Sequence, residues 1–425
     1  MDELSHLPCD WQKINVSSVA DVIDPHPSHR APDEDPLGIP FAGIGDLDES
    51  GKIRGNKVRR VSPEIYEEHS KRYQITANTI GFGRVASIGK IIDFKGLPKK
   101  ITISPTLALI EPNRIEKNFL IQALKSQDTQ LQINLLLTGS TRSSLGIALL
   151  RNLIIPFPKL PEQQKIATIL SSVDDVIEKT RAQIDKLKDL KTGMMQELLT
   201  KGIGHTEFKD SPVGQIPRSW DVVSVGSLTD VIDPQPDHRT PAEVIDGVPY
   251  VGLGDIGKSG LIDFSAARKV SQEAFEKQKE GFEIHPGAFI FGKIGTIGKP
   301  YVLPTERFYC LSANVVLVTT KKSINMKYLF QVFGSEIIDQ QVLLQTNTTS
   351  QPALGIKKVR DFLVPYPKQC EEVELITEVL ASVDNRISRV NDKLAHQLDL
   401  KKALMQDLLT GKVRVNLTDK ESAVV

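Results

Sequence analysis

The sequence predicts an α+β protein in which two similar, strand-rich globular domains are separated by two long antiparallel coiled-coil helices, with pseudo-twofold symmetry. Two observations lead to this expectation. Two long stretches carry a heptad pattern of apolar residues, and most of the chain that precedes the first stretch recurs before the second. A domain followed by a long helix has therefore been duplicated within one chain.

The first long helix is expected from Leu160 to Thr200. Pro161 lies where a first-turn proline is tolerated, and Gly202 follows the last apolar residue as a stop signal. Apolar residues recur at alternating spacings of four and three, which is the pattern of a coiled-coil seam. The seam consists of Ile166, Leu170, Val173, Ile177, Thr180, Ile184, Leu187, Lys191, Met194 and Leu198. The other faces are charged, so only a narrow stripe needs a packing partner.

The second long helix, from Glu371 to Thr410, supplies that partner. Its seam consists of Ile376, Leu380, Val383, Ile387, Val390, Leu394, Gln397, Lys401, Leu404 and Leu408. Either helix alone could be an ordinary amphipathic core helix. Because the two agree in length, in seam and in polar interruptions, we interpret them as a coiled pair. Its packing residues are Ile166, Leu170, Val173, Ile177, Ile184, Leu187, Ile376, Leu380, Val383, Ile387, Val390 and Leu394.

The internal repeat sets the domain boundaries. DVIDPHPSHRAP at Asp21–Pro32 returns as DVIDPQPDHRTP at Asp230–Pro241, and GIPFAGIGDL at Gly38–Leu47 returns as GVPYVGLGDI at Gly247–Ile256. The period is too long for a solenoid. We therefore expect a first globular domain at 1–158, a helix at 159–203, a second domain at 204–367, a second helix at 368–416 and a disordered tail at 417–425.

Within each domain, short apolar or β-branched runs bounded by Gly, Pro and Asp predict strands. In the first domain these runs are Val22–Ile23, Ile39–Ile44, Thr79–Ile88, Thr102–Ile110 and Leu153–Phe157. Helices are expected at Ser62–Lys71 and Ile115–Leu124, and after Ser271 and Asn325 in the second domain. Trp11 and Trp220 are expected to anchor the two cores.

Composition narrows the class of protein. The formal net charge is +0, which argues against indiscriminate nucleic-acid binding but permits a local basic face. Cys9, Cys310 and Cys370 form no CxxC pair, as expected in a reducing cytoplasm. No apolar run approaches the roughly 18 residues of a membrane span, and the N-terminus lacks a signal-peptide pattern. We therefore expect a cytoplasmic protein without a membrane segment.

Motifs of enzyme sites are not found. GRVASIGK at Gly83–Lys90 and GKIGTIGK at Gly292–Lys299 resemble a phosphate-binding loop, but the glycine spacing is one residue too long and no Ser or Thr follows the lysine. We expect tight turns there, with Arg84, Lys90, Lys293 and Lys299 facing outward. His29 and His238 lack further ligands at zinc spacing. The sequence thus predicts no catalytic residue, no metal site and no cofactor in this chain.

Polar, partly basic loops remain in both domains. Lys and Arg reach phosphates, while Arg, Asn and Gln can also read base edges, and a pseudo-twofold protein suits duplex DNA. The simpler alternative is a solvated charged surface. The candidate DNA-binding residues are His29, Arg30, Arg84, Lys90, Lys99, Lys100, Arg142, His238, Arg239, Lys293, Lys299, Arg307, Asn347, Thr349, Lys357 and Lys358.

Several of these segments resemble one family. The Gly139–Arg142 loop followed by IIPFPKLPEQQKIATIL at Ile154–Leu170 resembles the junction between target-recognition domain and conserved helix in type I restriction–modification specificity subunits. IPRSW at Ile216–Trp220 and GTIGK at Gly295–Lys299 are also similar to the family pattern. The resemblance extends from about Leu7 to Val415. One departure is Lys368–Glu372, which reads KQCEE where the first copy reads KLPEQQ.

The resemblance implies a non-catalytic subunit of a methyltransferase and endonuclease complex. Each target-recognition domain would bind one half of a bipartite double-stranded DNA site, and the helices would fix the gap and dock two methyltransferase (modification) subunits. Restriction subunits would join them. S-adenosylmethionine, ATP and Mg are then expected on the partner subunits. The alternative is a stand-alone two-lobed DNA-binding or scaffold protein without enzyme partners.

Overall fold

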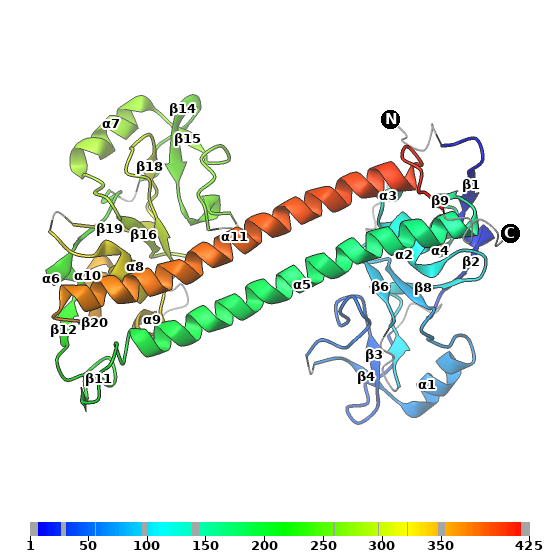
Figure 1. The fold of residues 1–425 in the computed structure, drawn as a ribbon, viewed down its shortest axis with the longest axis horizontal. Helices are drawn as coiled ribbons and strands as arrows, with labels where there is room; N and C mark the ends of the chain where they lie inside the picture. The colour runs from blue at the N-terminus through cyan, green and yellow to red at the C-terminus, as the bar shows by residue number, and fades with distance from the viewer. Residues whose placement is uncertain are drawn as a thin grey trace. The chain divides into compact units, whose positions relative to one another are not determined.

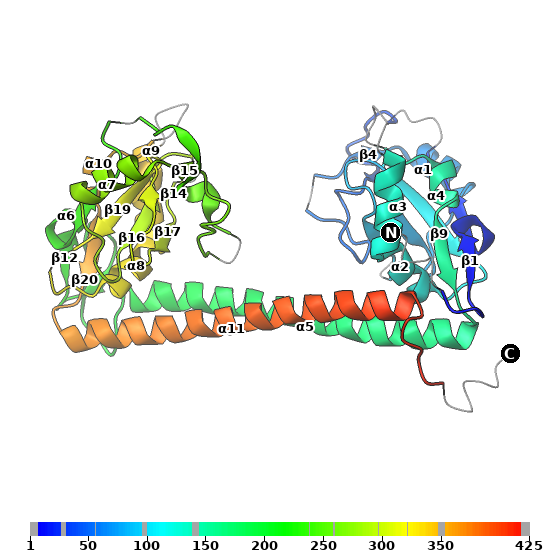
Figure 2. The same ribbon diagram turned by 90° about the horizontal axis from the view of Figure 1, so that it is seen from above.

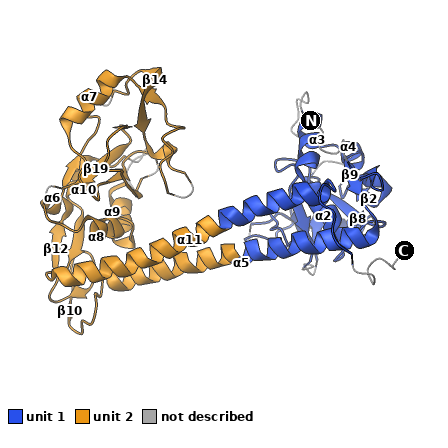
Figure 3. Ribbon diagram, turned by 45° about the horizontal axis from the view of Figure 1, so that its top comes forward, with its two compact units in different colours: residues 1–179, 394–425 blue, residues 180–393 orange. Residues whose placement is uncertain are grey.

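The computed structural model describes residues 7–26, 31–55, 57–95, 100–137, 144–237, 239–257, 260–295, 297–320, 322–346 and 353–417. The chain forms two compact units (Figure 3). Unit 1 comprises residues 1–179 and 394–425, and unit 2 comprises residues 180–393. Each unit therefore contains one globular domain and a part of both long helices, α5 (Leu160–Leu198) and α11 (Cys370–Leu409). The predicted α+β class with two strand-rich domains is confirmed.

The globular domain of unit 1 is built on a four-stranded antiparallel sheet in the order β2 (Ala20–Ile23), β8 (Leu107–Pro112), β5 (Ile80–Gly83) and β6 (Ile91–Asp93). Both faces of this sheet are covered. On β8, Ala108 and Ile110 pack with Phe119 of α2 (Lys117–Lys125), whereas Leu107 and Leu109 pack into a second cluster. This alternation explains why the strand reads as a continuous apolar run.

Smaller elements complete unit 1 (Figures 1 and 2). A three-stranded sheet, β4-β3-β7, lies against the second cluster, and β1 pairs with β9 at the start of α5. Their bounds are β1 (Gln12–Asn15), η2 (Val16–Ser18), β3 (Ile39–Ala42), β4 (Arg60–Val61), α1 (Pro63–Ser70), β7 (Thr102–Ile103), α3 (Gln127–Leu137), α4 (Ile147–Arg151) and β9 (Ile154–Phe157).

Unit 2 repeats this plan. Its four-stranded sheet has the order β13 (Asp230–Ile232), β19 (Val315–Thr319), β16 (Phe289–Gly292) and β17 (Pro300–Val302). The other elements are β10 (Phe208–Lys209), β11 (Ile216–Pro217), β12 (Asp221–Ser224), α6 (Val225–Leu228), β14 (Glu243–Val251), η3 (Leu253–Asp255), β15 (Lys269–Val270), α7 (Gln272–Gly281), β18 (Cys310–Leu311), α8 (Met326–Phe333), α9 (Glu336–Thr346), α10 (Ile356–Arg360) and β20 (Leu363–Tyr366). Each strand pairing of unit 1 has a counterpart here.

Within each unit the two long helices run antiparallel. In unit 1, Glu162 near the start of α5 binds Arg414 just after α11, and Asp174 further along α5 pairs with Lys401 at 2.5 Å. A residue further along α5 therefore pairs with a residue that comes earlier in the α11 segment, as expected for antiparallel helices. In unit 2, Lys191 pairs with Asp384 at 2.7 Å, and the amide of Ile203 donates to Glu372. The same Asp–Lys pair is thus formed in both units.

The seam residues face the packed side of these helices. Two groups can be distinguished by exposure. Buried are Ile166, Leu170, Ile177, Thr180, Ile184, Ile376, Leu380, Val383 and Val390. Half-buried are Val173, Leu187, Ile387 and Leu394. Among the described residues, no helix is both long and apolar enough to span a membrane.

The tryptophans attach each domain to a helix start. The Trp11 indole Nε1 donates to Glu162 Oε2 at 2.9 Å, and Trp220 Nε1 donates to Glu372 Oε2 at 3.0 Å. The second carboxylate oxygen binds Arg414 in unit 1 and His205 in unit 2. Glu372 therefore accepts the same tryptophan hydrogen bond as Glu162, although its second partner differs and the sequence at the start of α11 departs from that of α5. Both tryptophans are buried, as core anchors should be.

Candidate nucleic-acid interface

Three loops of unit 1 begin at one end of the four-stranded sheet. They are the loop after β2, the turn between β5 and β6, and the loop before α4. The buried Arg84 connects them, because its guanidinium lies 3.4 Å from the Asp24 carboxylate and its Nε donates to Leu145 O at 3.0 Å. The Leu145 amide donates back to Arg84 O, and Val85 forms a bridge with Ser144. One basic side chain therefore fixes the bases of all three loops.

Unit 2 has the same construction with lysine. Lys293 Nζ lies 2.8 Å from Asp233 Oδ2, and the two side chains are 5% and 10% exposed. The Leu354 amide donates to Lys293 O at 2.8 Å, and Ile294 forms a bridge with Ala353. A buried pair of this kind holds because each charge compensates the other in a poorly solvated site. The equivalent three loops are thus gathered at one end of the unit 2 sheet.

The expected outward orientation is wrong for Arg84, Lys90 and Lys293. Arg84 and Lys293 are buried in the ion pairs just described. Lys90 Nζ donates to the carbonyl oxygens of Ile44 and Leu47, and burial lowers the pKa of its amine. The physical reason is that closely packed loops bring buried carbonyl and carboxylate oxygens together, and these need cationic donors.

Arg307 is also held within its unit. Its guanidinium lies 4.2 Å from the Phe282 ring centroid and donates to Phe282 O and to Gln278 Oε1. Burial lowers the pKa of this guanidinium. Cation–π contact and two hydrogen bonds fix the side chain, so it is not extended toward solvent.

Other candidate residues are exposed, namely Lys100, Arg239, Lys299, Lys357 and Lys358. The last two lie on α10, where the Lys358 amine donates to Gln345 O at 2.9 Å. Seven candidates lie outside the described residues, namely His29, Arg30, Lys99, Arg142, His238, Asn347 and Thr349.

Sequence reasoning missed the carboxylates of the two ion pairs. Asp24 and Asp233 occupy the same position in the repeated segment DVIDP, and Arg84 and Lys293 occupy the same position in the two glycine-containing turns. Because both copies of the repeat retain a carboxylate at the first position and a cation at the second, the sequence could have indicated an ion pair between them. Among the described residues, no group of three His, Cys, Asp or Glu side chains could hold a metal ion.

A buried histidine pair supports the first of these loops in unit 1 only. His26 Nδ1 lies 3.0 Å from His69 Nε2, and His69 Nδ1 contacts the Thr102 hydroxyl. Unit 2 has Gln278 in place of His69. Its amide donates to the carbonyl oxygens of Pro234 and Leu311 and accepts from the Leu311 amide. The loop base is therefore titratable in unit 1 and neutral in unit 2.

We expect unit 1 to be less stable at acidic pH because of His69. Burial, and then the neighbouring His26, lower the pKa of His69, while Glu68 acts in the opposite direction. The unfolded chain then takes up the proton first, so stability is complete above the ordinary histidine pKa of about 6.5 and falls as the pH drops below it. Urea unfolding between pH 5 and 8 tests this, with H69Q as the matched variant. Equal pH dependence in both proteins would contradict the role of His69.

Comparisons with known proteins agree with the duplicated plan. The family model described as the type I restriction modification DNA specificity domain matches residues 8–189 and 217–399. A putative type I restriction enzyme MjaX specificity subunit from Methanocaldococcus jannaschii is 26% identical, with 97% of this chain and 96% of the relative covered. The MjaVIII specificity subunit of the same organism is 29% identical, with 75% and 76% covered.

Solved structures show the same fold. The type I restriction–modification S subunit from M. genitalium aligns with a TM-score of 0.53 at 15% identity, over 96% of this chain and 97% of that one. A chain from a structure of the assembly and conformational transition of the type I R-M system also gives a TM-score of 0.53, at 16% identity, over 96% and 99%. The fold is thus shared along nearly the whole chain.

Proposed function

The chain belongs to the type I restriction modification DNA specificity family, and we propose that it binds a bipartite DNA site as the specificity subunit of such a complex. The observation that carries this proposal is the duplication. Each match of the family model contains one globular domain with three loops gathered at one end of its sheet. Two such loop clusters suit a DNA site with two half-sites, one read by each unit.

The chemistry of each loop cluster supports a division of roles. The Asp24–Arg84 and Asp233–Lys293 pairs position the loops without contacting DNA themselves. The exposed cations Lys100, Arg239, Lys299, Lys357 and Lys358 reach phosphates, which fixes the register of the protein on the duplex. Base edges are read by the loops, whose candidates include Arg142 and Asn347. These two assignments remain predictions from sequence.

Family membership supports the following assignment of partners. The chain itself is non-catalytic, and its long helices dock two methyltransferase subunits, to which restriction subunits are added. S-adenosylmethionine, ATP and Mg are bound by those partners. Methylation of an adenine within a duplex requires that the base be turned out of the stack, so the specificity subunit must hold the DNA where the methyltransferase can reach it.

Replacing Lys357 and Lys358 with alanine should weaken DNA binding without changing the preferred sequence. Each lysine that neutralises a phosphate contributes about one unit to the slope of log affinity against log salt, so we expect the slope to fall by about two. Fluorescence anisotropy with a duplex that contains the preferred site measures both quantities. R218A, an exposed cation beside β11, is the control. A changed sequence preference at unchanged slope would contradict phosphate binding.

Selection from a random duplex library tests the proposal as a whole. The chain, purified with and without the methyltransferase of the same system, is expected to enrich two short half-sites at a fixed separation when the methyltransferase is present. A stand-alone DNA-binding protein would enrich its site alone and would not co-purify with a methyltransferase. A folded chain that enriches no sequence in either form would contradict the proposed function.

A further inference from the structure

The turn between β5 and β6 in unit 1 contains a residue with a strained backbone. Ala86 has a φ of 62°, in the left-handed region that favours glycine, and it is the only non-glycine residue with a positive φ in the described part of the chain. The Ser87 amide donates to Val85 O at 2.7 Å, so Ala86 is the central residue of a three-residue turn. Strain of this kind persists where the surrounding structure imposes it, and it is concentrated at functional sites.

The same turn has glycine where the backbone demands it. A Cβ atom on Gly83 would lie 2.2 Å from the Ser87 carbonyl oxygen, and Gly89 has a φ of 81°. In unit 2 the turn has a third glycine, because Gly295, with a φ of 79°, occupies the position of Ala86. Glycine would relieve the strain in unit 1 as well, yet unit 1 keeps a methyl group at this position.

The tip of the turn is exposed, whereas its base is fixed. Val85 is 36% exposed, and Ala86 is exposed as well. At the base, the buried Arg84 is held by the loops on either side, and the Gly83 amide donates to Lys90 O at 2.8 Å. Because the turn is already rigid, its apolar tip loses little conformational entropy when a ligand covers it.

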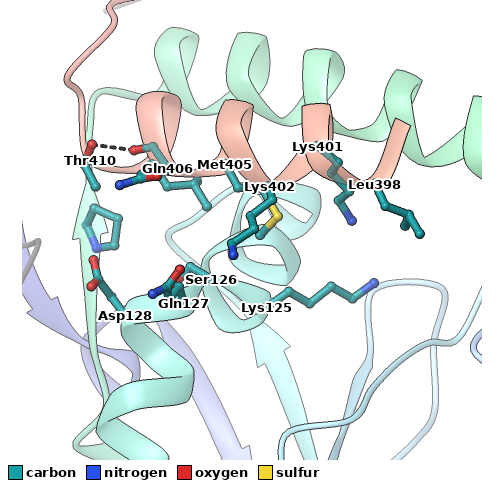
Figure 4. A pocket seen from close by; sticks show the side chains of 12 residues that line it. Lys125, Ser126, Gln127, Asp128, Leu398, Lys401, Lys402, Met405, Gln406 and Thr410 are labelled. Carbon is teal, nitrogen blue, oxygen red and sulfur yellow. Dashed lines mark hydrogen bonds between the residues drawn. The ribbon is translucent and has the colours of Figure 1, made fainter. Parts of the chain in front are cut away.

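Unit 2 presents an aliphatic side chain at the same place. Ile294 corresponds to Val85, is 47% exposed, and forms the same kind of bridge to the loop before α10. The exposed Leu398 of unit 1 is of a different kind, because it lies on α11 beside Lys401, at a groove between this helix and the α2–α3 corner (Figure 4). Val85 and Ile294 instead belong to the loop clusters that are proposed to read DNA.

The chemistry of the tip indicates what it contacts. Its side chains, those of Val85, Ala86 and Ser87, carry no charge, so the tip does not suit a phosphate. In the major groove, the apolar feature of a base is the C5 methyl group of thymine, which small apolar side chains such as alanine contact. Two side chains that end in methyl groups, at the tip of a rigid turn, match this feature.

We propose that Ala86 is a specificity-determining residue and that its methyl group, together with Val85, packs on the C5 methyl group of a thymine in the half-site bound by unit 1. The inference rests on the proposed function and adds one base of the site and the side chains that read it. Glycine in place of Ala86 would relax the turn but lose the contact. We therefore expect A86G to change stability and DNA recognition in opposite directions.

The test measures binding of the full-length chain, with the methyltransferase of the same system, to synthetic duplexes that contain the selected site. Each thymine is replaced in turn by deoxyuridine, which removes only the methyl group. For the wild type we expect one thymine whose replacement weakens binding about fourfold, the effect of burying one methyl group less. A86G should bind the unmodified duplex about fourfold more weakly and bind both duplexes with nearly equal affinity. A77G, the same substitution at an exposed position before the other end of β5, should discriminate like the wild type.

Thermal unfolding supplies the opposite readout. In a W220F background the fluorescence of Trp11 reports on unit 1, and A86G should raise the midpoint by about 2–4 °C because strain is relieved. G295A is the reverse substitution. A Cβ atom there meets no atom within 4 Å, so in a W11F background G295A should lower the midpoint of unit 2 through backbone strain alone.

The outcomes separate this inference from the proposed function. A folded wild-type chain that selects no DNA sequence would overturn both. Equal affinity for thymine and deoxyuridine at every position, or unchanged discrimination in A86G, would overturn the thymine contact alone. A lower midpoint in A86G would make its weaker binding a consequence of misfolding and would overturn the role of the strained methyl group.

Discussion

K293M is expected to destabilise unit 2 by about 3–5 kcal/mol, because it leaves the carboxylate of Asp233 buried without a compensating charge. Methionine fills a volume similar to that of lysine, so the lost charge rather than a cavity dominates the effect. The chain has two tryptophans, Trp11 in unit 1 and Trp220 in unit 2. In a W11F background, urea unfolding followed by tryptophan fluorescence therefore reports on unit 2.

The control for this experiment is K299M, which removes the same charge from an exposed position in the same turn. Its effect on the free energy of unfolding should stay within about 0.5 kcal/mol. Because the Asp233–Lys293 pair positions the unit 2 loops, K293M should also reduce the DNA affinity of unit 2. This effect should be seen under conditions in which the variant is still folded. Equal stabilities of K293M and K299M would show that the pair contributes nothing to the fold.

I177D and V383D are expected to destabilise the helix pair by about 3 kcal/mol or more. Ile177 is 4% exposed and Val383 is 8% exposed, so each substitution places a carboxylate in packed apolar surroundings. I177D tests the pair in unit 1, and V383D tests it in unit 2. Because the partner subunits dock on these helices under the proposed function, methyltransferase binding should weaken as well.

The matched control is K179D, an exposed position two residues from Ile177 on the same helix. Thermal unfolding and a methyltransferase pull-down measure the two effects together. K179D changes the net charge of the chain by more than I177D does, but its carboxylate is exposed to solvent rather than buried. If I177D and K179D unfold at the same temperature as the wild type, the seam does not stabilise these helices.

The long helices could be predicted nearly to the residue. α5 covers Leu160–Leu198 and α11 covers Cys370–Leu409, against expectations of 160–200 and 371–410. A heptad pattern is a local signal that extends over many turns, so few alternatives compete with it. The sequence also predicts that Gly202 ends the first long helix, and this glycine has a φ of 64°. It lies against Trp220, so any larger residue there would collide with the indole.

The orientation of the basic turn residues could not be predicted. Arg84 and Lys293 follow a glycine in a polar turn, a pattern that is typical of exposed cations. Their partners, Asp24 and Asp233, lie sixty residues earlier in the chain, and only the sheet brings each pair together. The sequence thus located the loops that carry the candidate contacts, whereas the pairs that hold these loops depend on tertiary structure.

Methyladenine mapping in a host tests the central claim most directly. Single-molecule sequencing would compare cells that express this chain with the methyltransferase of the same system, and cells that express either protein alone. We expect methyladenine in one bipartite motif, with two half-sites at a fixed separation, only when both proteins are present. The absence of any such motif from cells in which both proteins are folded and abundant would contradict the account.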